Sequence, residues 1–225
     1  MVRLFEGVGE IPGSVEWGVG VAYILTFLGG LGGMKVLVAC EFSGRVRDAF
    51  IKRGHDAMSC DLFPTEQPGP HYQGDVFDIL GNGFDLMIAH PPCTYLSNAG
   101  ARFLYPKGIL NIERLQLGLE AKEFFNRLYY ADIEKICIEN PVPSKVFGLP
   151  KYNQIIQPYY FGDMVQKKTC LWLKQLPFLD YIKPKEKPES TKIAGNWFNK
   201  GGRERQKNRA RTFQVIADAM ADQWG

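Results

Sequence analysis

The stretch LMIAHPPC at residues 86–93 decides how this chain folds and where its chemistry lies. Its first four residues form a short apolar run, which is typical of a buried strand. Two prolines then end the strand and stiffen the loop after it. Cys93 follows at the carboxyl end of the strand, where open α/β sheets bind ligands. A lone cysteine is more often a small buried side chain, but a thiol in a rigid loop at this place suggests a nucleophile.

A second strand end carries a carboxylate and an amide. The run KICI at 135–138 is short and apolar, and Glu139, Asn140 and Pro141 follow it directly. A thiol and a carboxylic acid that face one ligand suit attack on an electron-poor ring, because the thiolate adds to the ring while the acid protonates it. The two strand ends therefore predict a catalytic pair made of Cys93 and Glu139.

Apolar runs and helical patterns alternate along the chain from Met34 onward. We expect strands at 35–39, 56–60, 85–89, 135–138 and 165–173. We expect helices at 45–53, 111–130 and 209–223, and a loop at 177–195. The second helix is expected to turn Leu115, Leu119 and Phe125 toward the core. Strands separated by helices favour an α/β fold with a largely parallel sheet and helices on both faces.

These motifs together resemble the cytosine-5 DNA methyltransferases. Pro91-Pro92-Cys93 with SNAG at 97–100 is similar to that family's nucleophile loop, and Glu139-Asn140 is similar to its acid motif. EFSG at 41–44 follows the first strand, where the family keeps a Phe-x-Gly cofactor loop. The tail from Arg211 to Trp224 resembles the family's closing helix.

The resemblance extends from Met34 to Gly225 and implies a Rossmann-like, S-adenosylmethionine-dependent methyltransferase fold. Only about forty residues separate Thr169 from Arg211, where the family usually carries its target-recognition region. The chain is therefore similar to a small, phage-like form of the family. We expect short or relaxed sequence specificity, because little of the chain is available to read bases.

The resemblance also implies roles for the residues at the two strand ends. Cys93 would add to carbon 6 of cytosine, so that carbon 5 can take a methyl group from S-adenosylmethionine. Glu139 would contact ring nitrogen 3 and the exocyclic amine, helped by a raised carboxyl pKa. Asn140 would shape the strand end, and Lys168 would supply charge where the family has arginines. Ser97 is expected to contact DNA, whose target base must be flipped out or single-stranded.

A glycine turn and two aspartates are expected to hold the cofactor. The predicted cofactor-binding residues are Phe42, Ser43, Gly44, Asp61, Asp75 and Pro91. Asp61 ends a strand, where a carboxylate can bind ribose hydroxyls. In the family pattern, Asp75 would bind the adenine amino group. Both aspartates could equally be turn caps, and the segment lacks a full GxGxxG pattern.

Composition indicates a globular protein in a reducing compartment. Hydrophobic residues make up 45% of the chain, charged residues 23%, and the net charge is +3. The five cysteines are an odd number without a CxxC pair, and the three histidines lack ligand spacing, so we expect cytoplasmic thiols, no disulfide and no metal. A basic run near the end is either a solvated surface or a phosphate-binding segment. The residues of this run expected to contact nucleic acid are Arg203, Arg205 and Arg209.

Residues 1–33 differ from the rest of the chain. The run 17–33 has no charge and six glycines, and its apolar part is shorter than the ~20 residues that span a bilayer. We predict a poorly structured extension at 1–33 rather than a membrane anchor, followed by a monomeric methyltransferase domain at 34–225. Two alternatives remain open: an enzyme acting on RNA or a free pyrimidine nucleotide, and a catalytically inactive nucleic-acid-binding relative.

Overall fold

The central sheet has seven strands in the order β3-β2-β1-β4-β5-β7-β6. Its strands are β1 (Lys35–Ala39), β2 (Asp56–Asp61), β3 (His71–Gln73), β4 (Leu86–Ala89), β5 (Lys135–Pro141), β6 (Gln154–Ile156) and β7 (Thr169–Lys174). Neighbouring strands from β3 to β5 are parallel, and β7 runs antiparallel between β5 and β6. The chain moves outward from β1 to β3 and returns to β4 on the other side of β1. The carboxyl ends of β1 and β4 therefore form the topological switch point, where such sheets bind ligands.

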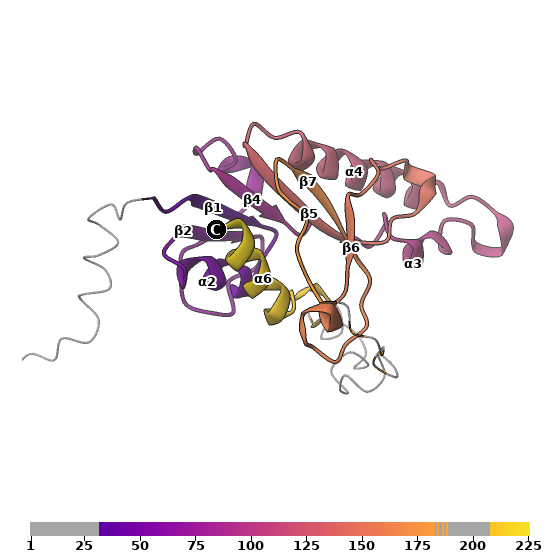
Figure 1. Ribbon diagram of the computed structural model, residues 1–225. Helices are drawn as coiled ribbons and strands as arrows, with labels where there is room; N and C mark the ends of the chain where they lie inside the picture. The colour runs from indigo at the N-terminus through magenta and orange to yellow at the C-terminus, as the bar shows by residue number, and fades with distance from the viewer. Residues whose placement is uncertain (1–31, 183, 185, 187, 189–207) are drawn as a thin grey trace, which may run out of the picture. The chain divides into compact units, whose positions relative to one another are not determined.

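The computed structural model describes residues 32–182, 184, 186, 188 and 208–225, which are coloured in Figure 1. From residue 33 onward they belong to one compact unit, Gly33–Gly225. The predicted extension at 1–33 lies outside the described residues except for its last two glycines. Within the described ranges, no helix is both long enough and apolar enough to cross a membrane.

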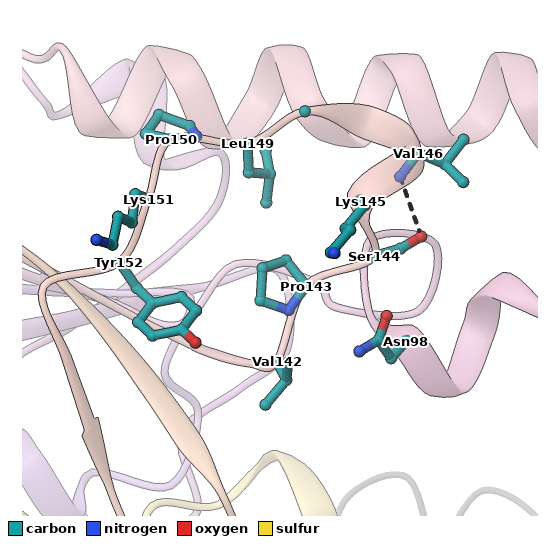
Figure 2. Close-up of a pocket in the computed structure, with 11 residues that line it drawn as sticks. Asn98, Val142, Pro143, Ser144, Lys145, Val146, Leu149, Pro150, Lys151 and Tyr152 are labelled. Atoms are coloured by element: carbon teal, nitrogen blue, oxygen red, sulfur yellow. Dashed lines mark hydrogen bonds between the residues drawn. The ribbon is translucent and has the colours of Figure 1, made fainter.

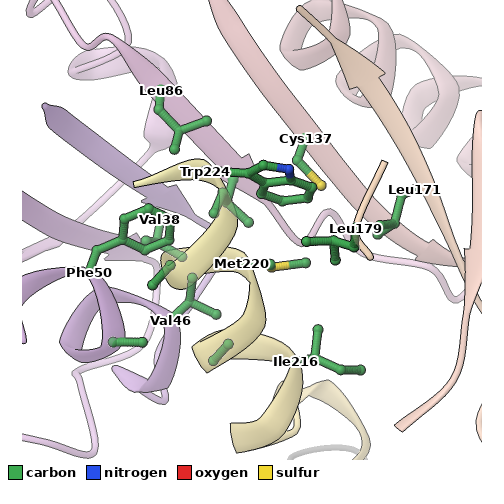
Figure 3. Close-up of a cluster of buried hydrophobic side chains, with 14 of the residues drawn as sticks. Val38, Val46, Phe50, Leu86, Cys137, Leu171, Leu179, Ile216, Met220 and Trp224 are labelled. Atoms are coloured by element: carbon green, nitrogen blue, oxygen red, sulfur yellow. The ribbon is translucent and has the colours of Figure 1, made fainter. Parts of the chain in front are cut away.

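One face of the sheet is covered by α2 (Arg45–Ile51) and α6 (Gln214–Trp224). Figure 3 shows Phe50 of α2 and Met220 of α6 in the same buried cluster as Val38 of β1. Full burial of an apolar side chain of this size contributes roughly 1.5–3 kcal/mol. The closing helix is thus fixed to the first helix of the fold by a shared core.

The other face is covered by α4 (Ile112–Tyr129), whose Phe125 lies in a second buried cluster with Leu37, Met87 and Trp172. Successive residues of β1 and β4 point to opposite faces, and both faces are covered. This explains why these strands are continuous apolar runs rather than alternating ones. The largely parallel sheet with helices on both faces confirms the predicted α/β Rossmann-like fold.

Short elements complete the fold at the carboxyl side of the strands. They are α3 (Asn98–Ala101) and the 3-10 helices η1 (Val76–Asp78), η2 (Pro106–Gly108), η3 (Lys145–Phe147) and η4 (Pro158–Phe161). The sequence analysis did not predict β3 or β6, each of which has only three residues.

Two sequence predictions about helices are wrong in detail. Of the three residues of α4 expected to face the core, Phe125 is buried and Leu115 packs partly buried against the core, as predicted. Leu119 is 47% exposed, and the neighbouring Gly118 is buried in its place. Gly118 lies against the ring of Phe147, and a glycine at a packing position leaves no apolar signal in the sequence. The last helix begins at Gln214 rather than at 209, because the three residues before it leave the helical conformation.

Candidate active site

Two hydrogen bonds join the ends of β4 and β5. The side-chain amide of Asn140 donates to the carbonyl of Pro91 at 3.4 Å. Farther along, the backbone N–H of Asn98 donates to the carbonyl of Val142 at 3.0 Å. Asn140 is buried, so its amide holds the loop that carries Cys93 against the neighbouring strand. The structure thus brings the predicted nucleophile loop and the predicted acid motif together.

Arg114 of α4 fixes the loop that follows Cys93. Its guanidinium donates to the carbonyls of Thr94 and Gly100, both at 3.1 Å, and stacks over the ring of Tyr95 at 5.0 Å. A Cβ atom on Gly100 would lie 2.3 Å from the Thr94 oxygen, closer than any real contact. Only glycine therefore allows the close approach that this loop requires.

Ser97 supports the same loop rather than facing solvent. It is 7% exposed, its N–H donates to the carbonyl of Cys93 at 3.1 Å, and it forms an isolated bridge with Pro143. These contacts fix Ser97 in the loop, and its predicted contact with DNA stays a prediction.

The Cys93 thiol is half-buried and surrounded by charges of both signs. Burial raises its pKa and the carboxylate of Glu139 raises it further, while the charges of Lys167 and Arg209 lower it. The balance keeps the pKa above its ordinary value. The two cations and a backbone hydrogen bond thus favour a thiolate at Cys93, while burial and the nearby carboxylate oppose it.

Glu139 is held as a carboxylate. Burial raises its pKa, but hydrogen bonds from His90 and Thr169 and the charges of Lys167 and His90 outweigh burial and lower the pKa to about 2. His90 Nδ1 lies 3.1 Å from Glu139 Oε2. The prediction of a raised pKa is therefore wrong, because the sequence does not show how many donors surround this carboxyl group.

His90 is a component of the site that the sequence analysis did not assign. The backbone N–H of His90 donates to the carbonyl of Ala39, so this residue connects the ends of β1 and β4. Its side chain is 6% exposed. Among the described residues, the buried Nε2 atom of His90 has no hydrogen-bond partner. A buried polar atom without a partner is costly in a native fold, which makes this position a candidate for ligand contact. Its place directly before Pro-Pro-Cys was the signal available in the sequence.

The sequence analysis expected Lys168 to supply positive charge to the site, but in the structure it is Lys167 whose charge acts there. The charge of Lys167 acts on both Cys93 and Glu139, and its amine donates to the carbonyl of Arg209 at 3.1 Å. Lys168 is exposed. Thr169, two residues after Lys167 at the start of β7, also hydrogen-bonds Glu139.

The turn after β1 is shaped by Gly44 and Glu41. Gly44 has a φ of 73°, which glycine adopts freely, and it precedes the first turn of α2. The buried carboxylate of Glu41 accepts hydrogen bonds from the Ser43 hydroxyl and the Val46 N–H, both at 2.9 Å. Glu41 thus occupies the N–H groups at the start of α2. The predicted cofactor residue Ser43 is buried and holds this carboxylate.

The other predicted cofactor residues surround the ends of β1 and β2. Cys40 has a positive φ of 58°, an uncommon conformation for a residue with a side chain. Burial, and then the charges of Asp61 and Asp75, raise the pKa of its thiol, which indicates that both carboxylates lie near it. Phe42 is 8% exposed and makes an edge contact with Phe63 at 6.4 Å.

Both aspartates also cap local turns. Asp61 Oδ1 accepts the N–H of Phe63 at 2.9 Å, and Asp75 Oδ1 accepts the N–H of Phe77 at 3.0 Å. Burial raises the pKa of Asp61 despite the hydrogen bond from Phe63. The alternative interpretation of the two aspartates as turn caps is therefore correct. Both also lie near Cys40, and a role in cofactor binding stays a proposal.

The basic tail is described only from residue 208 onward, so Arg203 and Arg205 lie outside the described residues. Arg209 is exposed, and its charge lowers the pKa of Cys93. Arg211 forms a two-armed ion pair with Glu66 at 2.6 and 2.7 Å. This pair fixes the start of the tail to the loop after β2, with Arg209 close to the nucleophile.

All five cysteines are free thiols. In the part of the chain that the structure describes, no three His, Cys, Asp or Glu side chains gather closely enough to hold a metal ion.

No protein-family model matches this chain, and none of the curated proteins does either. Among solved structures, the chain is similar to an E. coli protein described as a DNA modification methyltransferase encoded within a prophage. The two are 14% identical with a TM-score of 0.41, and the match covers 69% of this chain and 52% of the other. The chain thus spans about half the length of that protein. The strand order and core described above establish the Rossmann-like fold independently of this similarity.

Proposed function

We propose that this chain is an S-adenosylmethionine-dependent methyltransferase that acts on carbon 5 of cytosine in DNA. The observation that supports this most directly is the Cys93 thiol, half-buried beside the carboxylate of Glu139 at the switch-point edge of a Rossmann-like sheet. A half-buried nucleophile beside a fixed carboxylate suits covalent attack on a ring that the carboxylate binds.

In the proposed reaction, the Cys93 sulfur forms a bond to carbon 6 of the cytosine. The electrons of the carbon 5–carbon 6 double bond then make carbon 5 nucleophilic, and carbon 5 would take the methyl group from S-adenosylmethionine, which would leave as S-adenosylhomocysteine. A base afterwards removes the proton from carbon 5, and the bond to Cys93 breaks as the double bond returns. Lys167 and Arg209 favour the thiolate that starts the reaction, since both lower the pKa of Cys93.

The low pKa of Glu139 changes its proposed role. A carboxylate with a pKa of about 2 accepts a hydrogen bond from the exocyclic amine, but near neutral pH it carries no proton to donate to ring nitrogen 3, which is itself an acceptor. Protonation of ring nitrogen 3 then needs a second group. His90 is in hydrogen-bond contact with Glu139, so we assign the transferable proton to the His90–Glu139 pair rather than to Glu139 alone.

The edge formed by β1 and β2 offers groups that fit a nucleoside cofactor. The carboxylates of Asp61 and Asp75 suit ribose hydroxyls and an adenine amine, and Phe42 offers an aromatic ring. The strained backbone at Cys40 marks this turn as a functional position. S-adenosylmethionine bound there would supply an electrophilic methyl group.

The main test is incubation of the purified protein with methyl-labelled S-adenosylmethionine and, separately, DNA, RNA and dCMP, followed by nucleoside analysis. We expect labelled 5-methylcytosine in DNA. Label that appears only in RNA, or only in the free nucleotide, would identify that molecule as the substrate instead of DNA. Label on an exocyclic nitrogen would reject the covalent mechanism.

A further inference from the structure

A groove lies beside the nucleophile loop, along the segment that follows β5. It has a volume of about 610 Å³. Ten of its eleven lining residues lie within residues 142–152, and the eleventh is Asn98 of the nucleophile loop (Figure 2). None of the catalytic or cofactor residues described above lines it.

Both sides of the groove are fixed by hydrogen bonds to the sheet and to the loop. Asn98 donates its N–H to the carbonyl of Val142 at 3.0 Å, and the Trp172 indole donates to the carbonyl of Pro150 at 2.7 Å. Between these points the side chain of Phe147 is buried. The groove is therefore formed in advance and needs no rearrangement to accept a ligand.

The walls of the groove offer flat apolar surfaces. Figure 2 shows Leu149 and Tyr152 directed toward the ring of Pro143 across the hollow. The Tyr152 ring is held from behind by an edge contact with Trp172 at 5.9 Å, so its orientation is fixed. A rigid aromatic ring facing a proline and a leucine is suited to a flat heteroaromatic group, because such groups stack on aromatic side chains.

The charge of the groove is positive. Lys145 and Lys151 line it and are exposed, and none of its eleven lining residues is acidic. Two ammonium groups beside an apolar hollow fit a ligand with a flat apolar part and an anionic part. A nucleotide has both, since its base can stack and its phosphate can accept hydrogen bonds from lysine.

The groove is adjacent to the proposed catalytic pair. Val142 is three residues after Glu139, so at most about 11 Å of chain separates their Cα atoms. On the other side, Asn98 follows Ser97, whose N–H donates to the carbonyl of Cys93 at 3.1 Å. A ligand in the groove therefore lies next to whatever occupies the Cys93–Glu139 site.

We propose that this groove binds the nucleotide adjacent to the target cytosine on the same strand. Its base packs against Tyr152, Pro143 and Leu149, and its phosphate lies near Lys145 and Lys151. This inference rests on the proposed DNA methyltransferase function. It gives the enzyme a context preference of one neighbouring nucleotide, read by a fixed surface of the catalytic unit.

The first test reverses the charge of the groove. The variant Lys145→Glu/Lys151→Glu is compared with Lys52→Glu/Lys122→Glu, which makes the same change in net charge at lysines outside the groove. We expect the groove variant to raise KM for DNA at least tenfold while kcat and the Kd for S-adenosylmethionine stay within threefold. The control should stay within twofold of the wild type. The slope of log Kd against log salt concentration should fall by about 0.9 in the groove variant, as the loss of one phosphate contact requires.

The second test removes the base. DNA substrates are compared that carry an abasic site on one side or the other of the target cytosine. An abasic site on one side should raise KM at least fivefold, and an abasic site on the other side should change KM little. In Tyr152→Leu this difference should shrink to less than twofold, because the stacking ring is gone. The comparison of abasic substrates uses the wild-type protein alone, so it tests the groove proposal even if Tyr152→Leu is unstable.

The outcomes separate the two proposals. If the wild type methylates DNA but the groove and control variants lose affinity equally, the lysines are a general basic surface and the groove proposal is rejected. It is also rejected if abasic sites on both sides leave KM unchanged. If the wild type transfers no methyl group to DNA in any assay, the proposed function itself fails, and the groove proposal fails with it.

Discussion

His90 Nδ1 and Glu139 Oε2 lie 3.1 Å apart, across the ends of strands β4 and β5, although 49 residues separate them in the sequence. The contact places a proton carrier against the carboxylate proposed to bind the cytosine ring. It also leaves the buried Nε2 of His90 without a partner among the described residues. The acid function proposed for the site therefore involves two residues rather than one.

Replacement of His90 should change both the charge state of Glu139 and the rate. In His90→Ala the main hydrogen bond to Glu139 is lost while the carboxyl group stays buried, so its pKa should rise above 2. ¹³C NMR of the glutamate side chains measures this pKa directly. The control His55→Gln changes a histidine on another part of the fold and should leave the Glu139 pKa unchanged. A Glu139 pKa that stays near 2 in His90→Ala would show that His90 does not set the charge of this carboxyl group.

His90→Gln separates hydrogen bonding from proton transfer. A glutamine amide can donate a hydrogen bond to Glu139 but cannot carry a transferable proton at neutral pH. We expect methyl transfer to fall about 100-fold or more, within the ~100- to 10,000-fold range of general acids. Single-turnover kinetics on DNA provide the measurement. Activity above about half the wild-type value would mean that His90 only positions Glu139.

Glu139→Gln should also abolish most of the activity. The amide keeps the shape of the side chain but replaces an acceptor with a donor that faces the cytosine amine. We expect kcat to fall by about 100-fold or more with S-adenosylmethionine binding unchanged. Glu134→Gln, which replaces a glutamate before β5, is a matched control and should retain normal turnover. Comparable activity in both variants would remove Glu139 from the mechanism.

The sequence was sufficient to predict that Cys93 and Glu139 lie close together, because both follow short apolar runs at strand ends. The parallel β4–β5 pairing places those ends side by side, as the motif requires. The charge state of Glu139 could not be predicted, since it depends on donors from His90 and Thr169, which are distant in the sequence.

The misplacement of Leu119 and the difficulty of choosing between Lys167 and Lys168 have a common cause. The side of an element that faces the core or the site depends on its exact register, and a shift of one residue reverses the assignment in extended chain. Lys167 and Lys168 are the same residue type at adjacent positions, so the sequence does not distinguish them. In the structure, the charge of Lys167 acts on Glu139. In α4, the packing position filled by Gly118 has no apolar side chain that could have fixed the register.

This register gives a prediction for the two lysines. Lys167→Gln removes a charge that lowers the pKa of both Cys93 and Glu139, so the Cys93 thiol should become harder to ionise. We expect the reaction of Cys93 with iodoacetamide to slow by about threefold or more at pH 8. Lys168→Gln is the matched control, and the exposed position of Lys168 should leave the rate unchanged. A larger effect from Lys168→Gln would restore the original assignment.

Cys93→Ser tests the covalent step. A serine hydroxyl is far less ionised than a thiol, so methyl transfer should fall to background while S-adenosylmethionine binding persists. DNA that contains 5-fluorocytosine at the target should form an adduct with the wild type that survives denaturation, because the fluorine cannot leave as a proton does. The adduct should be absent with Cys93→Ser and present with Cys60→Ser, which changes a buried cysteine of β2. Near-native turnover by Cys93→Ser would exclude the covalent mechanism.

The low pKa of Glu139 also makes a prediction about folding stability. Its pKa is about 2 in the folded protein against 4.5 for the free side chain, so the folded state favours the carboxylate. This contributes on the order of 3 kcal/mol above pH 4.5, which is lost as the pH falls from about 4.5 toward 2. Urea unfolding of the wild type and Glu139→Gln at pH 3 to 7 measures the difference. The free energy of unfolding of the wild type should fall more steeply below pH 4.5, because glutamine cannot titrate. Parallel curves for the two proteins would show that Glu139 keeps its ordinary pKa, and the acid function would then return to Glu139 alone.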